Sequence, residues 1–203
     1  MYFILCILYT MYLSLYPLNK ETIDLAEQSF PAEYINQLKT SSSNYHGSLI
    51  GRYIVSKHIH QETWVWYNIA TWVYQQDKFY FSYAHTDEYV LVAIEERKIW
   101  VDLEIIKSRD TSLLHQYHSE LEHMDKVTWE SFYAMRTAKE ALIKFLDLSF
   151  NEIESIELVG VSEFDIHYGD IHFSKTLSLI YHGEKYAVFH GEKDQLSYAV
   201  TMW

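Results

Sequence analysis

Apolar residues recur along the chain with the period of a helix in some segments and of a strand in others. Residues 19–39 have helical spacing, which Pro31 divides into two pieces, and Asn19 or Thr22 is placed to cap the first piece. The next segments predict, in order, a loop at 40–44, a short helix at 49–59 and aromatic strands at 62–74 and 78–95.

The second half of the chain repeats this rhythm loosely, without internal sequence identity. Its apolar spacing predicts a strand at 98–105, helical stretches at 112–123 and 129–147, and strands at 154–161, 164–168, 171–181 and 185–190. Strands and helices that alternate in this way indicate a mixed α+β fold, as one compact unit or two small lobes.

The helix expected at 129–147 has two separate faces. Its apolar stripe recurs at three- and four-residue steps through Phe132, Met135, Ala138, Leu142 and Phe145. Arg136, Glu140 and Lys144 form a second line at four-residue steps. Taken alone, this line is typical of surface ion pairs, which contribute only about 0.3–0.5 kcal/mol each.

The first 18 residues carry no charged side chain and raise the question of a membrane segment. A spanning helix needs about 20 apolar residues, and a signal peptide usually has a basic start and a small-residue cleavage site. This run contains Thr10, Ser14 and four tyrosines, and Pro17 lies near its end. A buried strand is therefore favoured over a membrane segment.

Composition fits a folded, intracellular protein. The chain has 203 residues, of which 49% are hydrophobic, with only six glycines and two prolines, so it can bury a substantial core. Cys6 is the single cysteine and cannot form an internal disulfide. The cytoplasm is the expected location.

The net charge of −12 argues against general nucleic-acid binding, which needs a basic face. Half of the 16 basic residues fall between Arg97 and Lys144, so a local positive rim is one interpretation and ordinary solvated charge is the other.

Three carboxylates in two distant segments carry the clearest chemistry. On a strand, Asp102 and Glu104 point to the same side, and on a helix Glu140 and Lys144 lie one turn apart. Mg²⁺ prefers oxygen ligands and usually keeps positions for water and substrate phosphates. These residues therefore predict a magnesium site with a lysine beside it, acting on a phosphorylated cofactor.

Three segments, in order, resemble motifs of one enzyme family. Residues 79–94, which include His85, are similar to the region of an Ile-Ser-His-Ser motif; residues 99–104 resemble Gly-Ile-Asp-Ile-Glu; and residues 132–144 resemble Trp-Ser-x-Lys-Glu-Ala/Ser-x-x-Lys. These are motifs of the Sfp-type 4′-phosphopantetheinyl transferases. The resemblance implies two similar α/β lobes, a pseudo-dimer divided here as 1–97 and 98–203, with the active site in the cleft between them.

The resemblance also implies an activity, the transfer of the phosphopantetheine arm of coenzyme A to a serine of an apo acyl or peptidyl carrier protein. Asp102, Glu104 and Glu140 would hold Mg²⁺, Glu140 would take the serine proton, and Lys144 would stabilise phosphate oxygens. His85 would hydrogen-bond a phosphate of coenzyme A, with Thr86 keeping the hydroxyl that follows it. A monomer is expected, because the length resembles the two-lobed branch of the family.

The sequence departs from the family pattern at several motif positions and at the residues that hold the nucleotide. Trp100 stands where a small residue is usual, Arg136 where an aromatic is usual, and Ala84 where a serine is usual. The lysine and arginine that hold the nucleotide are missing from their usual places. Lys39 and Arg52 are candidate replacements, as are Lys57 and Lys78.

Other functions remain open. One is an inactive homologue that binds a carrier protein or coenzyme A as a scaffold, and another is a binding module tethered to a membrane by residues 1–18. Zinc binding by His58 with His60, or by His115 with His118 and His123, has no cysteine partner nearby. The chain contains no Gly-x-Ser-x-Gly elbow and no Walker or Rossmann glycine loop.

Overall fold

The fold is taken from a computed structural model that describes residues 11–42, 44–58, 74–76 and 79–202. Contacts within the chain divide it into two compact units, Met1–Lys98 and Ile99–Trp203. Each unit contains one antiparallel sheet together with helices. The mixed α+β class is therefore confirmed. The strand expected at 62–74 lies almost wholly outside the described residues, as does most of the apolar run 1–18.

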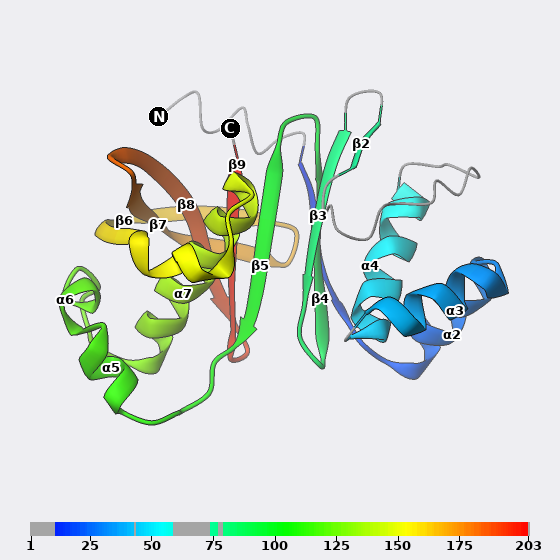
Figure 1. Cartoon of the computed structure of the whole chain (residues 1–203), viewed down its shortest axis with the longest axis horizontal. Helices are drawn as coiled ribbons and strands as arrows, with labels where there is room; N and C mark the ends of the chain where they lie inside the picture. The colour runs from blue at the N-terminus through cyan, green and yellow to red at the C-terminus, as the bar shows by residue number, and fades with distance from the viewer. Residues whose placement is uncertain (1–10, 43, 59–73, 77–78, 203) are drawn as a thin grey trace. The chain divides into compact units, whose positions relative to one another are not determined.

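In its described residues, the first unit is a four-stranded sheet with three helices beside it. The strands β1 (Tyr12–Pro17), β2 (Tyr74–Gln76), β3 (Phe79–His85) and β4 (Tyr89–Glu95) lie in the order β1-β4-β3-β2. Helix α4 packs on β3 and β4, while α2 and α3 pack on α4 (Figure 1). The helices are α2 (Lys20–Ser29), α3 (Ala32–Ser41) and α4 (Tyr45–His58).

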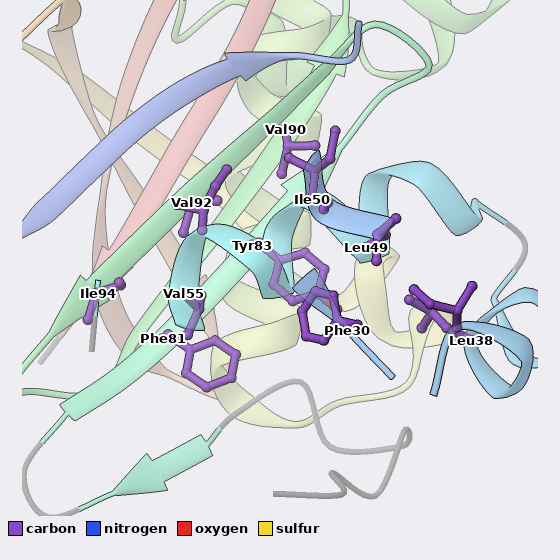
Figure 2. Packing of buried hydrophobic residues seen from close by; sticks show 13 residues of the cluster. Phe30, Leu38, Leu49, Ile50, Val55, Phe81, Tyr83, Val90, Val92 and Ile94 are labelled. Atoms are coloured by element: carbon purple, nitrogen blue, oxygen red, sulfur yellow. The ribbon is translucent and has the colours of Figure 1, made fainter. Parts of the chain in front are cut away.

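The core of this unit lies between α4 and the sheet. Apolar side chains of the helices meet alternate side chains of β3 and β4, as Figure 2 shows. The buried members include Phe30, Leu38, Leu49, Ile50, Val55, Phe81, Tyr83, Val90, Val92 and Ile94. Burial of this apolar face holds the helices against the sheet.

The predicted break at Pro31 and the predicted cap at Asn19 are both confirmed. Pro31 separates α2 from α3, and the Asn19 Oδ1 accepts a hydrogen bond of 2.9 Å from the Thr22 backbone N–H. Two boundaries were wrong by a few residues. Helix α3 continues to Ser41 into the expected loop, and α4 begins at Tyr45 rather than at residue 49.

Helix α4 lies very close to β3 because it carries glycines one turn apart. A Cβ atom at Gly47 would lie 2.5 Å from the His85 ring, and one at Gly51 would lie 2.6 Å from the Tyr83 ring. His85 and Tyr83 are two residues apart on β3, so both point to the helix side of the strand. The glycines therefore set the depth at which His85 is packed.

The second unit is a five-stranded sheet with one long helix on it. Its strands are β5 (Ile99–Ile105), β6 (Glu157–Tyr168), β7 (Ile171–Tyr181), β8 (Glu184–Lys193) and β9 (Leu196–Met202), in the order β5-β9-β8-β7-β6. Helix α7 (Trp129–Leu146) packs on β5, β8 and β9 (Figure 1). The shorter helices are α5 (Ser112–Gln116), α6 (His118–Leu121) and the 3₁₀ helix η1 (Phe150–Ser155).

Helix α7 is closed at both ends by local chemistry. The Thr128 hydroxyl accepts a hydrogen bond from the Ser131 backbone N–H, and Asp147 ends the helix in the left-handed conformation with φ 58°. The predicted apolar stripe is confirmed, because its five members are all buried: Phe132, Met135, Ala138, Leu142 and Phe145.

The two units share a topology in the residues that the structure describes. Each begins with a strand, continues through helices, and ends in an antiparallel meander whose last strand pairs with the first strand of the unit. In the first unit β4 returns to pair with β1, and in the second unit β9 returns to pair with β5. The loose repetition seen in the sequence thus corresponds to a repeated chain path.

Several predictions for the second half need correction. Residues 154–155 belong to η1 rather than to a strand, and the two strands expected at 154–161 and 164–168 are one strand, β6, interrupted by bulges. The helical stretch 112–123 is two short helices that meet at Tyr117. Strand β9 was missed.

Within the described part of the chain, no helix combines the length and the apolar character that a membrane crossing requires.

Candidate metal centre

The carboxylates of Asp102, Glu104 and Glu140 lie together on the helix side of β5. One oxygen atom from each lies within 4.8 Å of the others. The structure therefore brings together the three residues that the sequence selected from two segments about 40 residues apart.

The packing of helix α7 against strand β5 explains why these side chains meet. Trp100, Asp102 and Glu104 alternate along β5 and so share one face. On that face the Trp100 ring meets the Phe145 ring edge to face, with centroids 6.2 Å apart. Two residues further along the strand, Asp102 pairs with Lys144. Glu140 lies one helical turn before Lys144, beside the next part of the strand. Strand and helix thus run in opposite directions beside each other.

Two cations accompany the carboxylates. The Lys144 Nζ lies 2.5 Å from Asp102 Oδ1, and the Arg136 Nη2 lies 2.8 Å from Glu140 Oε1. Glu140 Oε1 nevertheless has no hydrogen bond of acceptable geometry, so the Arg136 contact is an ion pair by distance only. The line Arg136, Glu140 and Lys144 is thus not a ladder of surface ion pairs, because Lys144 pairs with the strand instead.

One carboxylate oxygen of the cluster has no hydrogen-bond partner in the described part of the chain. Asp102 Oδ2 is buried and has no hydrogen-bond partner among the described residues. A buried carboxylate oxygen without a partner is costly unless a cation or a donor reaches it. Together with the unsatisfied Glu140 Oε1, it fits a hard divalent cation bound by oxygens, such as Mg²⁺.

Crowding of the carboxylates changes their protonation. Burial, and then the charge of Asp102, raise the pKa of Glu140 to about 7, although Arg136 opposes the shift. Burial and Asp102 also raise the pKa of Glu104. For Lys144, burial acts to lower the pKa, but the Asp102 carboxylate outweighs it and the net shift is upward. The cluster therefore disfavours full ionisation and would gain from an added positive charge.

Lys139, the lysine of the Lys-Glu-Ala segment, has a structural position. It is 2% exposed, and its Nζ lies 2.8 Å from Glu120 Oε2. The same carboxylate oxygen accepts a hydrogen bond from the Leu158 backbone N–H. Lys139 therefore ties α7 to α6 and to the start of β6 rather than serving the carboxylate cluster.

At least half of the eight basic residues between Arg97 and Lys144 lie within ion-pair distance of a carboxylate. They are Arg97, Arg136, Lys139 and Lys144, beside Glu95, Glu140, Glu120 and Asp102 respectively. These pairs favour ordinary charge pairing over a positive rim, which stays a prediction. Arg109 donates from Nε to the Tyr133 hydroxyl at 2.8 Å.

The remaining candidates lie in the first unit and have local partners. Thr86 accepts hydrogen bonds at its hydroxyl from the backbone N–H groups of Glu88 and Tyr89, which shapes the turn between β3 and β4. The Asn44 side chain donates to the Thr86 carbonyl at 3.2 Å. His85, the preceding residue, is packed against Gly47 of α4.

The two candidate nucleotide-binding cations are held by other side chains. Lys39 Nζ lies 3.2 Å from Glu27 Oε1 and 4.9 Å from the centroid of the Tyr45 ring. Arg52 donates from Nη1 to the Tyr34 hydroxyl at 2.9 Å. Both side chains thus have structural partners in the first unit, and their proposed role toward a nucleotide stays a prediction.

A pocket of about 660 Å³ lies elsewhere in the second unit. It is lined by residues between His123 and Ser131 and by Val161, Glu163, Lys175 and Glu192. None of the three clustered carboxylates lines it, so it is separate from the candidate metal centre.

Sequence reasoning missed a second group of metal-ligating side chains, formed by Asp165, His167 and His172. The signal was present, because Gly169-Asp170 is a two-residue hairpin turn that brings His167 opposite His172. The group of His115, His118 and His123 is not among the possible metal-binding groups of the described residues. The pair of His58 and His60 cannot be compared, because His60 lies outside the described residues.

Comparison with known proteins gives no match, either to a protein-family model or to a curated protein.

Proposed function

We propose that the chain is a divergent Mg²⁺-dependent 4′-phosphopantetheinyl transferase, which moves the phosphopantetheine arm of coenzyme A to a serine of an apo acyl or peptidyl carrier protein. The observation that carries the proposal is the convergence of the Asp102, Glu104 and Glu140 carboxylates, together with a buried Asp102 oxygen that has no hydrogen-bond partner among the described residues. Lys144 pairs with the other Asp102 oxygen. The order of the three sequence motifs supplies the family.

The repeated chain path supports the finer part of the fold proposal. The first strand of each unit pairs with the last strand of its meander, and a helix covers one face of each sheet. A pseudo-dimer of two similar α/β lobes has this internal repetition. The proposed active site then belongs to the cleft of such a pseudo-dimer.

The three carboxylates would hold Mg²⁺ in this scheme. When bound, Mg²⁺ neutralises charge on the pyrophosphate of coenzyme A and favours in-line displacement. Asp102 would supply the buried Oδ2, which has no other partner among the described residues. Glu104 and Glu140 would supply one oxygen each, and the remaining positions would be left to water and phosphate.

The side chains around the cluster have distinct tasks in the transfer. The serine oxygen of the carrier forms a bond to the β-phosphorus of coenzyme A, and the bond from that phosphorus to the bridging oxygen breaks, so 3′,5′-ADP leaves. Glu140 accepts the serine proton, directly or through a water, a role worth about 10²–10⁴-fold in rate. Lys144 has three N–H donors, so it can hold Asp102 with one and a phosphate oxygen with another.

Coenzyme A recognition is proposed for His85 and Thr86 of the first unit, with Lys39 or Arg52 in place of the missing nucleotide-binding residues. Arg52 and Lys39 would have to exchange a tyrosine or a carboxylate partner for a phosphate. The cost of that exchange predicts weaker binding of coenzyme A than a dedicated cationic pocket would give.

The test is a transfer assay with the full chain, coenzyme A, Mg²⁺ and a panel of apo carrier proteins, read by the mass of the intact carrier. One phosphopantetheine group per carrier is expected, with none when a chelator removes the metal. Asp102→Asn, Glu104→Gln and Glu140→Gln should each abolish transfer. Glu122→Gln is the matched control, because Glu122 is an exposed carboxylate of the same unit that lies 3.4 Å from His118, away from the cluster.

Two outcomes would contradict the proposal. One is transfer that survives in the variant carrying all three amides. The other is binding of carrier or coenzyme A without transfer under any metal condition, which would favour the inactive scaffold homologue.

A further inference from the structure

The hairpin between β6 and β7 ends in two histidines and an aspartate that converge on one point. His172 Nε2 lies 2.9 Å from Asp165 Oδ1, and His167 Nε2 lies 3.8 Å from the same oxygen. The two imidazole rings are stacked, with centroids 4.2 Å apart and an angle of 6° between their planes. One donor atom from each of the three residues lies within 4.8 Å of the others.

Strand register and a bulge build this cluster. His167 and His172 are directly paired across the hairpin, which places their side chains on the same face. The register shifts between Glu163 and Ile166, where β6 carries one residue more than β7. Such a bulge re-aims side chains locally, and Asp165 lies within it, with its carboxylate near both imidazoles.

The backbone beneath His172 is held firmly. The Tyr198 hydroxyl of β9 donates to the His172 carbonyl at 2.9 Å and accepts from its N–H at 3.2 Å. Gly191 of β8 leaves room for this carbonyl, since a Cβ atom there would lie 2.1 Å from it. His172 is therefore preorganised, although the three side chains themselves are open to solvent.

We propose that Asp165, His167 and His172 form a binding site for a divalent transition-metal ion of the zinc class. Two imidazole nitrogens and one carboxylate oxygen are the mixed ligands that Zn²⁺ accepts, whereas Mg²⁺ prefers oxygens alone. Ligands at zinc distances in tetrahedral geometry lie about 3.3 Å apart, so the 2.9 Å and 3.8 Å separations require only small side-chain shifts. The fourth position is left to water or to a further ligand.

The proposed site is independent of the carboxylate cluster on β5 and α7. The three ligands come from β6 and β7, and they differ in chemistry from the three oxygen ligands of Asp102, Glu104 and Glu140. The preference for zinc or for magnesium therefore distinguishes the two sites in an experiment. If one of the two proposed sites binds no metal, the proposal for the other site is unaffected.

Zinc binding to the untagged full chain, measured by calorimetry with Mg²⁺ in excess, tests the inference. One zinc site is expected in the parent protein. Replacing a residue that only hydrogen-bonds a metal ligand typically lowers metal affinity about 10–100-fold. Removing a ligand itself should cost at least as much, so His167→Gln, His172→Gln and Asp165→Asn should each lower zinc affinity at least about 10-fold. The matched control is His118→Gln, because His118 is exposed and lies 3.4 Å from the Glu122 carboxylate. It should leave zinc affinity unchanged.

A second readout identifies the ligands directly. With Cu²⁺ as the probe, the electron paramagnetic resonance spectrum should show coupling to two imidazole nitrogens in the parent protein, and to one in His167→Gln or His172→Gln. The thermal midpoint without metal should change little in all variants, since their side chains lie at the surface. Zinc affinity or nitrogen coupling that is unaffected by either histidine replacement would overturn the proposal, and so would an absence of zinc binding by the parent protein.

Discussion

Lys144 of α7 pairs with one oxygen of Asp102 on β5, while the other oxygen of Asp102 is buried without a partner in the described part of the chain. The lysine thus satisfies one oxygen of a carboxylate that also lies in the cluster with Glu104 and Glu140, and it leaves the second oxygen unsatisfied. This asymmetry distinguishes the cluster from an ordinary ion-pair network, because a purely structural site would be expected to satisfy both oxygens.

Glu140→Gln should stabilise the protein in the absence of metal and remove its response to Mg²⁺. The pKa of Glu140 is raised from its ordinary 4.5 to about 7, so the folded state binds more protons than the unfolded state in between. The contribution of Glu140 to the stability of the metal-free protein is therefore fully present below pH 4.5 and is lost as the pH rises through 7. The variant should have the higher thermal midpoint at pH 8 without metal.

Thermal unfolding at pH 5 and pH 8, with and without Mg²⁺, measures this effect. Mg²⁺ should raise the midpoint of the parent protein at pH 8 and leave that of the variant unchanged. Glu122→Gln, an exposed carboxylate elsewhere in the same unit, should behave like the parent at both values. A Glu140→Gln protein that is less stable than the parent at pH 8 would show that Arg136 pairing dominates instead.

His190 should make the second unit sensitive to mild acid. Its side chain is fully buried and bonded to the Ser197 hydroxyl, and burial lowers its pKa from 6.5 to about 3, with Lys175 adding to the shift. The unfolded chain binds a proton that the folded state excludes between these values, so stability falls as the pH drops from 6.5 toward 3.

Urea unfolding at pH 6.5 and pH 5 should show this loss as about 1–2 kcal/mol attributable to His190. The comparison is with His190→Gln, which keeps a hydrogen-bonding side chain without a titrating group and should lose correspondingly less. His115→Gln, at an exposed helical position, is the control and should follow the parent protein. Equal pH dependence in the parent and His190→Gln would rule out a buried neutral imidazole.

Gly47→Ala should destabilise the first unit. The added methyl group would lie 2.5 Å from the His85 ring, and overpacking of this kind costs about 1–3 kcal/mol, against a gain of up to about 1 kcal/mol from helix propensity. Gly160→Ala is the control, since nothing lies within 4 Å of its added Cβ. Chemical denaturation measures both.

Combining Gly47→Ala with His85→Ala should recover part of the loss, because the ring that clashes is then absent. Simple additivity of the two changes would mean that α4 can shift away from β3 without cost.

Lys139→Met should be more harmful than the double change Lys139→Met with Glu120→Gln. The single change leaves the Glu120 carboxylate, which is 22% exposed, without its cation, and breaking a mostly buried pair costs about 3 kcal/mol. The double change removes both charges and keeps a group that can accept from the Leu158 N–H. Unfolding free energies of the two variants provide the measurement, and a double variant as unstable as the single one would contradict the interpretation.

Patterning predicted the elements that carry strong periodicity. Helix α7 was expected at 129–147 and spans Trp129–Leu146, because its apolar stripe repeats over several turns. The carboxylate cluster was also predicted. Spacing places Asp102 and Glu104 on one face of a strand and Glu140 and Lys144 on one face of a helix, and the order of the three motifs was the reason to combine the two segments in one site.

Strand β9 was missed because its turn carries no glycine. Asp194 and Gln195 connect β8 to β9 with φ of 49° and 65°. Turns with this left-handed conformation usually contain Asn-Gly or Asp-Gly, which makes them recognisable in a sequence. The strand β6 was predicted as two strands because two bulges interrupt the alternation of its side chains between the faces of the sheet.

The zinc-class cluster shows the limit of scanning a sequence for ligand spacing. His167 and His172 are five residues apart, a separation that suits neither one strand nor one helix face. Only the pairing of β6 with β7 makes them neighbours, so the register of the hairpin must be known first.

Because β5 is hydrogen-bonded to β9, the two acids on β5 lie on a strand whose partner is among the last segments of the unit to leave the ribosome. The helix that carries Glu140 emerges well before that partner does. Binding of the proposed Mg²⁺ by all three acids is therefore expected only after β9 has paired with β5, so the affinity for that ion would report whether the second unit is completely folded.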